Sequence, residues 1–197
     1  MEKGEKMKVK VFLKRGFEEV EAITVIDYLR RAGIIVEVVS FEETKEVEGG
    51  HRIKIIADIM AEDLVIDEET AIYIPGGMLQ MVSLQNDKRV LEYLQKANSL
   101  HCYIIGICAG PMVMEKAGIL KGKVITSFPG LESGFKTIER YSEKRIFRDD
   151  NIITARGPEL ASELAYYLIE LFKGSEIRRK IEKETLYCFQ NMDLKEK

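Results

Sequence analysis

A cysteine between two glycines is the residue of this sequence best placed to do chemistry. Cys108 stands at the centre of Gly106-Ile-Cys108-Ala-Gly110, a G-x-C-x-G pattern. In a nucleophile elbow this spacing forms a sharp strand-to-helix turn that exposes the nucleophile in a strained conformation. The pattern therefore predicts a reactive thiol. The alternative is a small core residue, because free cysteines are commonly buried.

The residues on either side of Cys108 favour the elbow. Tyr103 to Ile107 is a short apolar run rich in β-branched residues, which predicts a buried strand. Pro111 suits the first turn of a helix, where its missing N–H costs nothing. Cys108 would then lie at the positive end of a helix, close to backbone N–H groups that stabilise an anion.

The rest of the chain alternates predicted strands with predicted helices. We expect strands at residues 9–13, 34–41, 53–57, 71–74, 103–107, 124–126, 145–148 and 152–155, the last two antiparallel, and helices at 18–32, 87–97 and 158–172. The clearest helix places Ala22, Val25, Ile26 and Leu29 on one face. This alternation predicts an α/β sandwich with a mainly parallel sheet. No linker divides the chain, so we expect one domain over residues 1–197, with a core at about 7–185 and a polar C-terminal tail.

Three loops should meet at the carboxyl ends of the strands, where sites lie in such sheets. They are residues 16–21, residues 75–77 and the Cys108 elbow. Their convergence would bring Glu21 and two glycine amides to the cysteine. Glu21 could instead be an ordinary first-turn acid that favours the helix dipole, as Glu18 and Glu19 could. Its position beside Ala22 favours Glu21 as the inward one.

Composition excludes several classes of function. The 197 residues carry a net charge of −3 with interleaved acids and bases, so neither nucleic-acid nor membrane binding is indicated. The three cysteines, at positions 102, 108 and 188, lack metal-ligand spacing. Cys102 and Cys108 would lie about 20 Å apart along one strand, too far for a disulfide. We expect free thiols in a soluble, cytoplasmic protein.

Four motifs together resemble the ThiJ/PfpI superfamily, in the branch of the Parkinsonism-associated protein DJ-one. They are Gly16-Phe-Glu-Glu-Val-Glu-Ala22, Pro75-Gly-Gly77, Ile107-Cys-Ala-Gly-Pro111 and Thr154-Ala-Arg-Gly-Pro158. The resemblance covers about residues 7–185. It implies a flavodoxin-like three-layer sandwich of the class I glutamine amidotransferase type, and a homodimer.

The resemblance also implies roles for individual residues. Cys108 would be the reactive cysteine and Glu21 the acid hydrogen-bonded to it. Backbone amides of Gly76, Gly77 and Ala109 would line an oxyanion pocket. Further residues expected to line the site are Phe128, Gly16, His51 and Arg156, His51 by analogy with residues that approach across the dimer.

Two departures from the superfamily bear on activity. Protease-like branches carry a histidine directly after the cysteine, where this chain has Ala109. Animal members carry a histidine before the proline of a later loop, where this chain has Phe128. We therefore expect a cofactor-independent and metal-independent cysteine enzyme acting on reactive carbonyls, as a glyoxalase or deglycase. The alternative is a redox sensor or stress chaperone without significant turnover, and a cysteine peptidase is a third reading that Ala109 disfavours.

Without a neighbouring imidazole, Cys108 needs another source of thiolate character. A helix terminus contributes at most about 2 kcal/mol, which lowers a thiol pKa by about 1.5 units. Burial acts in the opposite direction. We therefore expect hydrogen bonds to the sulfur from the elbow amides and from a protonated Glu21.

Overall fold

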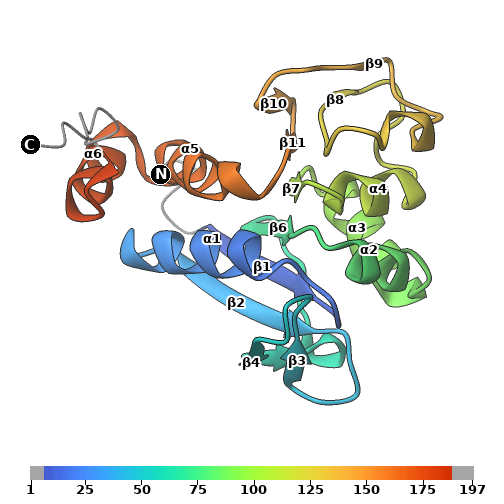
Figure 1. Ribbon diagram of the computed structural model, residues 1–197, viewed down its shortest axis with the longest axis horizontal. Helices are drawn as coiled ribbons and strands as arrows, with labels where there is room; N and C mark the ends of the chain where they lie inside the picture. Colours follow the sequence, from blue (N-terminus) through green and yellow to red (C-terminus); the bar gives the residue numbers. More distant parts are fainter. Residues whose placement is uncertain (1–6, 188–197) are drawn as a thin grey trace, which may run out of the picture.

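The computed structural model describes residues 7–187 and centres on a seven-stranded sheet in the order β10-β11-β7-β6-β1-β2-β5 (Figure 1). Its strands are β1 (Lys8–Leu13), β2 (Ile35–Ser40), β5 (Ile59–Met60), β6 (Thr70–Ile74), β7 (Tyr103–Ile107), β10 (Ile146–Asp149) and β11 (Ile152–Ala155). All neighbouring strands run parallel except β10, which is antiparallel to β11. The predicted α/β architecture is confirmed.

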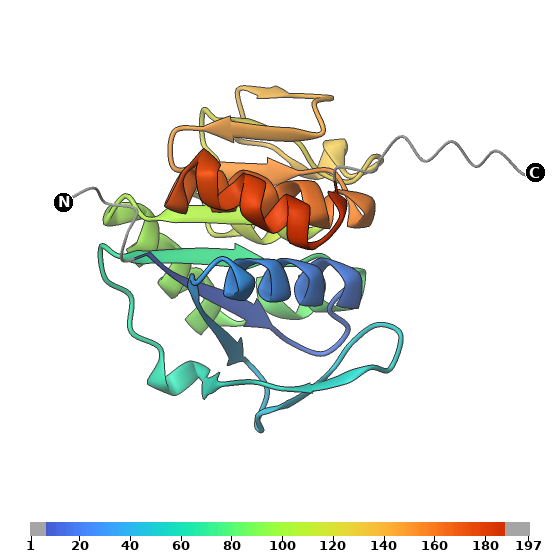
Figure 2. The same cartoon turned by 90° about the vertical axis from the view of Figure 1, so that its left-hand side faces the viewer.

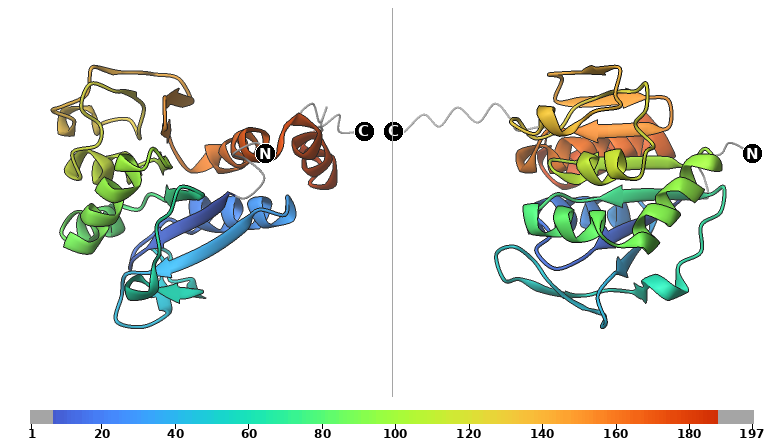
Figure 3. Two further views of the ribbon diagram at one scale, coloured as in Figure 1. Left: turned by 180° about the vertical axis from the view of Figure 1, so that it is seen from behind. Right: turned by 90° about the vertical axis from the view of Figure 1, so that its right-hand side faces the viewer.

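Helices cover both faces of this sheet. On one face lie α1 (Glu19–Arg31), α5 (Ala161–Lys173) and α6 (Ser175–Glu184), as Figure 2 shows. On the other face lie α2 (Met78–Gln85), α3 (Lys88–Ser99) and α4 (Gly110–Lys116), seen in the right-hand view of Figure 3. Short 3₁₀ turns span Ala61–Asp63, Glu132–Gly134 and Pro158–Leu160. The predicted apolar face of α1, from Ala22 to Leu29, packs into the core.

Two predicted strands form outside the main sheet. β4 (Lys54–Ile56) pairs with β3 (Glu46–Glu48) in an antiparallel hairpin, and β8 (Val124–Ile125) pairs with β9 (Arg140–Tyr141). The end residues of β4 are exposed and its centre is half-buried, so it lacks the burial on both faces that a central strand has. The edge of the main sheet is instead β5, a two-residue strand that the sequence did not indicate.

Two helices, α2 and α6, form where none was predicted. α6 lies beyond the last predicted helix but inside the expected core, and its mostly charged sequence buries Ile181 while it packs against α5. Most of the expected polar tail, including Cys188, lies outside the described residues. Over residues 7–187, every helix falls short of the length and apolar character that a membrane crossing requires.

The strand order reverses at β1. The chain passes from β1 to β2 on one side, whereas β6 and β7 lie on the other side. Such a switch point opens a crevice at the carboxyl ends of the strands, because the loops that follow diverge to opposite faces. The loops after β1, β6 and β7 all begin at this edge, as the parallel pairing of the three strands requires.

Candidate active site at the Cys108 elbow

The turn after β7 has the backbone geometry of a nucleophile elbow. Cys108 has a φ of 58°, in the left-handed region that residues with a Cβ rarely adopt. Its N–H donates to the Ala155 carbonyl at 2.9 Å, and its own carbonyl accepts the Phe128 N–H at 3.0 Å. A Cβ on Gly110 would collide with the Ile74 carbonyl oxygen. The strained, half-buried cysteine is therefore held by the strands and loops around it.

Glu21, on the first turn of α1, is buried against Cys108. Its carboxyl group lies close enough to the Cys108 thiol to interact with it, and its Oε2 accepts the Gly76 N–H at 2.5 Å. Its Oε1 is buried without a hydrogen-bond partner among residues 7–187. A Cβ on Gly76 would lie 2.5 Å from Glu21 Oε2 and 3.1 Å from the Cys108 sulfur. Only glycine fits where the loop after β6 packs against both groups.

The buried environment of Glu21 and Cys108 shifts the pKa values of both side chains. Burial raises the pKa of the Glu21 carboxyl group to about 7, against the lowering effect of the Gly76 and Cys108 hydrogen bonds. Burial also raises the pKa of the Cys108 thiol, and an ionised Glu21 beside it would raise that pKa further. Two groups in such contact share their protons, so the pair carries at most one negative charge near neutral pH.

The hydrogen bonds around the pair act on that charge in opposite directions. Donation by the Gly76 N–H and by the thiol lowers the pKa of Glu21, and the contact with Glu21 raises the pKa of Cys108, so these bonds favour the charge on the carboxylate. An ionised Glu21 would leave its buried Oε1 unpaired, whereas a protonated Glu21 is a donor for the thiolate. The Ala109 N–H donates a hydrogen bond to the Cys108 sulfur, and this bond lowers the thiol pKa. Glu21 keeps its proton up to about pH 7, so below this pH it is available as the donor that the sequence led us to expect.

The expected set of oxyanion donors needs one correction. The Gly76 N–H is occupied by Glu21, so Gly76 positions the acid instead of binding substrate oxygen. The Ala109 N–H lies at the sulfur, and the Gly77 N–H has no hydrogen-bond partner within the described part of the chain. Gly77 therefore offers an unoccupied amide for an oxyanion, and the Ala109 amide could receive one only in place of its hydrogen bond to the sulfur.

Of the four residues expected to line the site, two lie beside the elbow. Phe128 is hydrogen-bonded to it through the backbone, and its side chain is 45% exposed. Gly16 lies against Gly77, whose Cβ, if present, would meet the Gly16 carbonyl. Arg156 does not turn its charge toward the cysteine in any interaction seen here, because its guanidinium donates to the Glu143 carbonyl at 2.9 Å.

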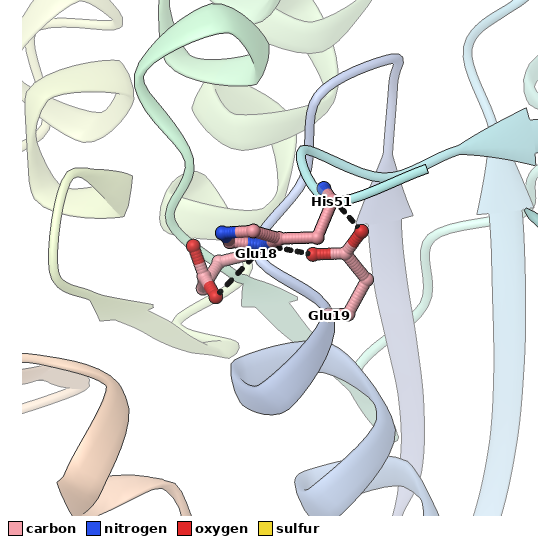
Figure 4. Close-up of side chains that lie close together, drawn as sticks. All are labelled: Glu18, Glu19 and His51. Atoms are coloured by element: carbon pink, nitrogen blue, oxygen red, sulfur yellow. Dashed lines mark hydrogen bonds and ion pairs between the residues drawn. The ribbon is translucent and has the colours of Figure 1, made fainter. Parts of the chain in front are cut away.

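His51 is held by Glu19 on the same first turn of α1, as Figure 4 shows. The His51 Nδ1 lies 2.8 Å from Glu19 Oε2 and 3.7 Å from Glu18 Oε1. Glu19 Oε1 also accepts the His51 backbone N–H at 2.6 Å. Glu19 is buried, which the sequence did not indicate, since Glu21 alone was expected to face inward. Glu19 therefore fastens the β3–β4 hairpin to α1.

The charges of this second cluster compensate one another. Burial alone would raise the pKa of Glu19, but hydrogen bonds from the His51 side chain and from nearby amides lower it below its usual value. The hydrogen bond to Glu19, together with the charge of Glu18, raises the pKa of His51. The donor atoms of the three side chains lie within 4.8 Å of one another, so within residues 7–187 they are the group that could hold a metal ion. In the arrangement seen, a protonated His51 offsets one of the two carboxylate charges.

Two buried polar side chains position the site without a signal in the sequence. The Tyr73 hydroxyl donates to the Glu21 carbonyl at 2.9 Å, which fixes the first turn of α1 over β6. Gln80 accepts the Lys14 N–H at 2.8 Å and donates to the Pro75 carbonyl at 2.9 Å, joining the loops after β1 and β6. For Gln80, the sequence hints at a buried role only through its place in the mostly apolar run of α2, and for Tyr73 it gives no hint.

Comparisons with known proteins agree with this geometry. The sequence profile of the DJ-1/PfpI family matches residues 7–171. The Parkinson disease protein 7 homolog of Danio rerio is 32% identical over 174 residues, which cover 87% of this chain and 92% of the relative. Protein DJ-1 homolog B of Arabidopsis thaliana is 33% identical, and the match spans 39% of its length. The structure of oxidized Toxoplasma gondii DJ-1 aligns with a TM-score of 0.85 at 31% identity, covering 91% of this chain and 98% of that one.

Proposed function

The chain belongs to the DJ-1/PfpI family, and from that premise we propose that it is a cysteine-dependent enzyme acting on small reactive carbonyls. Cys108 is the nucleophile and Glu21 the acid–base group, with no cofactor. The proposed activity is that of a glyoxalase, or of a deglycase that attacks the adducts such carbonyls form. The observation that carries this proposal is a fully buried carboxyl group in hydrogen-bond contact with a thiol on a strained turn.

The proposed reaction converts a 2-oxoaldehyde and water into a 2-hydroxy acid. The Cys108 thiolate adds to the aldehyde carbon, and the new oxyanion is stabilised by the Gly77 and Ala109 amides until Glu21 supplies its proton. The Glu21 carboxylate then removes the hydrogen from the former aldehyde carbon, the hydroxyl proton on that carbon passes to the ketone oxygen, and Glu21 returns its proton to the neighbouring carbon. This leaves a thioester on Cys108, which water hydrolyses to the 2-hydroxy acid and the free thiol.

Methylglyoxal turnover tests the proposal, with lactate as the expected product. Wild type should form lactate, Cys108→Ala should form none, and Glu21→Ala should lose at least about 100-fold in kcat, as expected for a lost acid–base group. Cys102→Ala is the matched control, because it removes a thiol that is not at the elbow. Equal rates for wild type and Cys108→Ala would refute the proposal.

Redox sensing by the same cysteine is the second candidate. It is favoured by the oxidised state named for the Toxoplasma gondii neighbour and by Phe128, which removes an imidazole from the loop beside the elbow. In that case Cys108 would be oxidised to the sulfinate while carbonyl turnover stays negligible. A peptidase is disfavoured, because Ala109 follows the cysteine where protease-like branches carry histidine.

We also propose a homodimer, in a reducing cytoplasm where a nucleophilic thiol persists. Val20 and Ile23 of α1, together with Ile53 and Ile56 of the β3–β4 hairpin, are each at least 40% exposed, although all four are large and apolar. Glu19 and His51 bring these two elements together. Light scattering after gel filtration should show a dimer that Ile23→Lys weakens, and a monomeric wild type at micromolar concentration would contradict this proposal.

A further inference from the structure

Two exposed apolar side chains, Leu79 and Phe128, lie on different sides of the Cys108 elbow. Leu79 is 55% exposed and Phe128 is 45% exposed. They belong to separate segments, α2 and the loop after β8. Scattered apolar residues on a surface need no explanation, but these two are placed by the loops that build the site.

Three glycines, at positions 16, 76 and 77, lie between Leu79 and the Cys108 sulfur. A Cβ on Gly16 would lie 2.6 Å from the Leu79 Cβ, so the Leu79 side chain covers Gly16. Gly16 in turn packs against Gly77, and the adjacent Gly76 is the residue whose Cβ would lie 3.1 Å from the Cys108 sulfur. Leu79 therefore lies over the loops after β1 and β6, and the second of these loops reaches the Cys108 sulfur through Gly76.

Phe128 borders the site on the side of the loop after β8. Its N–H donates to the Cys108 carbonyl at 3.0 Å, which fixes its backbone to the elbow itself. Its ring lies near Gly157, where a Cβ would come within 3.4 Å of the ring. The ring is thus held at the elbow while nearly half of its surface stays open.

The charges at this edge disfavour an anionic ligand. Glu18 is close enough to raise the pKa of Cys108 by its charge. The Arg156 guanidinium, the cation that the sequence placed here, donates to the Glu143 carbonyl. Within residues 7–187, no hydrogen bond or ion pair brings a Lys or Arg side chain to Cys108 or Glu21. A carboxylate or phosphate on the substrate would have an acid, and no positioned cation, for a neighbour.

We infer that Leu79 and Phe128 determine specificity at Cys108 and select uncharged carbonyl compounds that carry an apolar substituent. This inference rests on the proposed function for its substrate class, which is a 2-oxoaldehyde with an aryl or branched alkyl group on the ketone carbon. The substituent packs between the two side chains while Cys108 attacks the aldehyde carbon. Apolar contact of this kind changes kcat/KM by about tenfold or more.

Alkylation rates test the selection without any need for turnover. Iodoacetanilide, iodoacetamide and iodoacetate share one reactive group and differ in carrying a phenyl group, no apolar group, or a negative charge. With the rates normalised to those of free cysteine, Cys108 should favour iodoacetanilide over iodoacetamide by about tenfold and disfavour iodoacetate. Leu79→Gln and Phe128→Gln should each lower the first ratio severalfold, whereas Leu79→Met should keep it.

Val65→Gln is the matched control, because Val65 is an equally apolar residue, 65% exposed, in the segment before β6. It should leave every ratio unchanged. Ratios in Leu79→Gln and Phe128→Gln within about twofold of wild type would overturn the inference. The competing explanation is that Leu79 and Phe128 form a contact between subunits. In that case gel filtration of the same variants would show a changed oligomeric state while the alkylation ratios stay unchanged, and this result would also overturn the inference.

Turnover of phenylglyoxal and glyoxal then separates this inference from the proposed function. The kcat/KM ratio of phenylglyoxal to glyoxal should fall about tenfold in the Leu79→Gln, Phe128→Gln double variant, and intrinsic reactivity cancels in that comparison. Turnover of both aldehydes with an unchanged ratio would refute the selection alone. Selective alkylation without turnover of either aldehyde would refute the proposed enzyme and leave the apolar selection at Cys108 standing.

Discussion

Replacement of Glu21 is the most direct probe of how Cys108 becomes reactive. Glu21→Gln keeps an acceptor for the Gly76 N–H and a donor for the sulfur, and so imitates the protonated acid. Glu21→Ala removes both and leaves the Gly76 N–H, which donates at 2.5 Å in the wild type, without its partner. The two variants therefore separate the donor function of Glu21 from its bulk.

The expected shift follows from one hydrogen bond to a charged group. Such a bond contributes about 1.5–3 kcal/mol, and one pKa unit corresponds to about 1.4 kcal/mol. The Cys108 pKa should therefore rise by about 1–2 units in Glu21→Ala and by less than half of that in Glu21→Gln. The opposite distribution of charge, with Glu21 ionised beside a neutral thiol, predicts a fall in both variants, because like-charge repulsion is then removed.

The assay is the ultraviolet absorbance of the thiolate, followed against pH. All proteins should carry Cys102→Ala and Cys188→Ala, so that the signal comes from Cys108. Thermal unfolding of each variant checks that the fold is retained, since the orphaned amide in Glu21→Ala costs about 1–3 kcal/mol. A lower Cys108 pKa in Glu21→Ala would refute the expectation that the sulfur carries the charge, and an unchanged pKa in both variants would reduce Glu21 to a structural acid.

Three further outcomes follow from the same contacts. Because burial raises the pKa of Glu21 from 4.5 to about 7, the folded protein holds a proton that the unfolded chain loses. The free energy of unfolding should therefore fall by about 3 kcal/mol as pH rises through that interval, and chemical denaturation of Glu21→Gln should lack this decline. Gly76→Ala should abolish carbonyl turnover and lower the free energy of unfolding by about 1–3 kcal/mol, because its Cβ would lie 2.7 Å from the Cys108 Cβ. Gly157→Ala is the control and should be tolerated. Retained activity in Gly76→Ala would contradict the packing at Cys108. Graded peroxide should oxidise Cys108 before Cys102, which is 2% exposed, and peptide mass spectrometry that found Cys102 oxidised first would count against the elbow.

The sequence predicted most strands of the central sheet because they are short apolar runs, several of them followed within three residues by glycine or proline. The same criterion predicted β4 and β8 as strands but not their position outside the main sheet, because a short run of β-branched residues does not specify its partner strand. It also failed for α2, whose buried residues are Gln80, Met81 and Leu84, because the exposed residues Met78, Leu79 and Val82 are apolar as well. A helix with apolar residues on both faces carries no periodic signal for the buried one.

The candidate site was predictable to the extent that backbone requirements fix residue types. The elbow needs small residues around Cys108, and these are legible in one sequence. Which amide serves which acceptor is not legible, so Gly76 was expected to bind an oxyanion although its N–H belongs to Glu21. The contribution of Gln80 and Tyr73 depends on contacts between segments distant in sequence, which no local pattern encodes.

Glu19 and Glu21 show why position along a helix does not determine the chemistry of an acid. Both lie in the first turn of α1 and both are buried, yet the pKa of Glu19 is lowered and that of Glu21 is raised. Burial raises both values, so the difference lies in what faces each carboxyl group. Glu19 receives several hydrogen bonds from the β3–β4 hairpin and stays ionised as a structural anchor. Glu21 faces one amide and a thiol, retains its proton up to about pH 7, and so is the carboxyl group that can exchange a proton with Cys108.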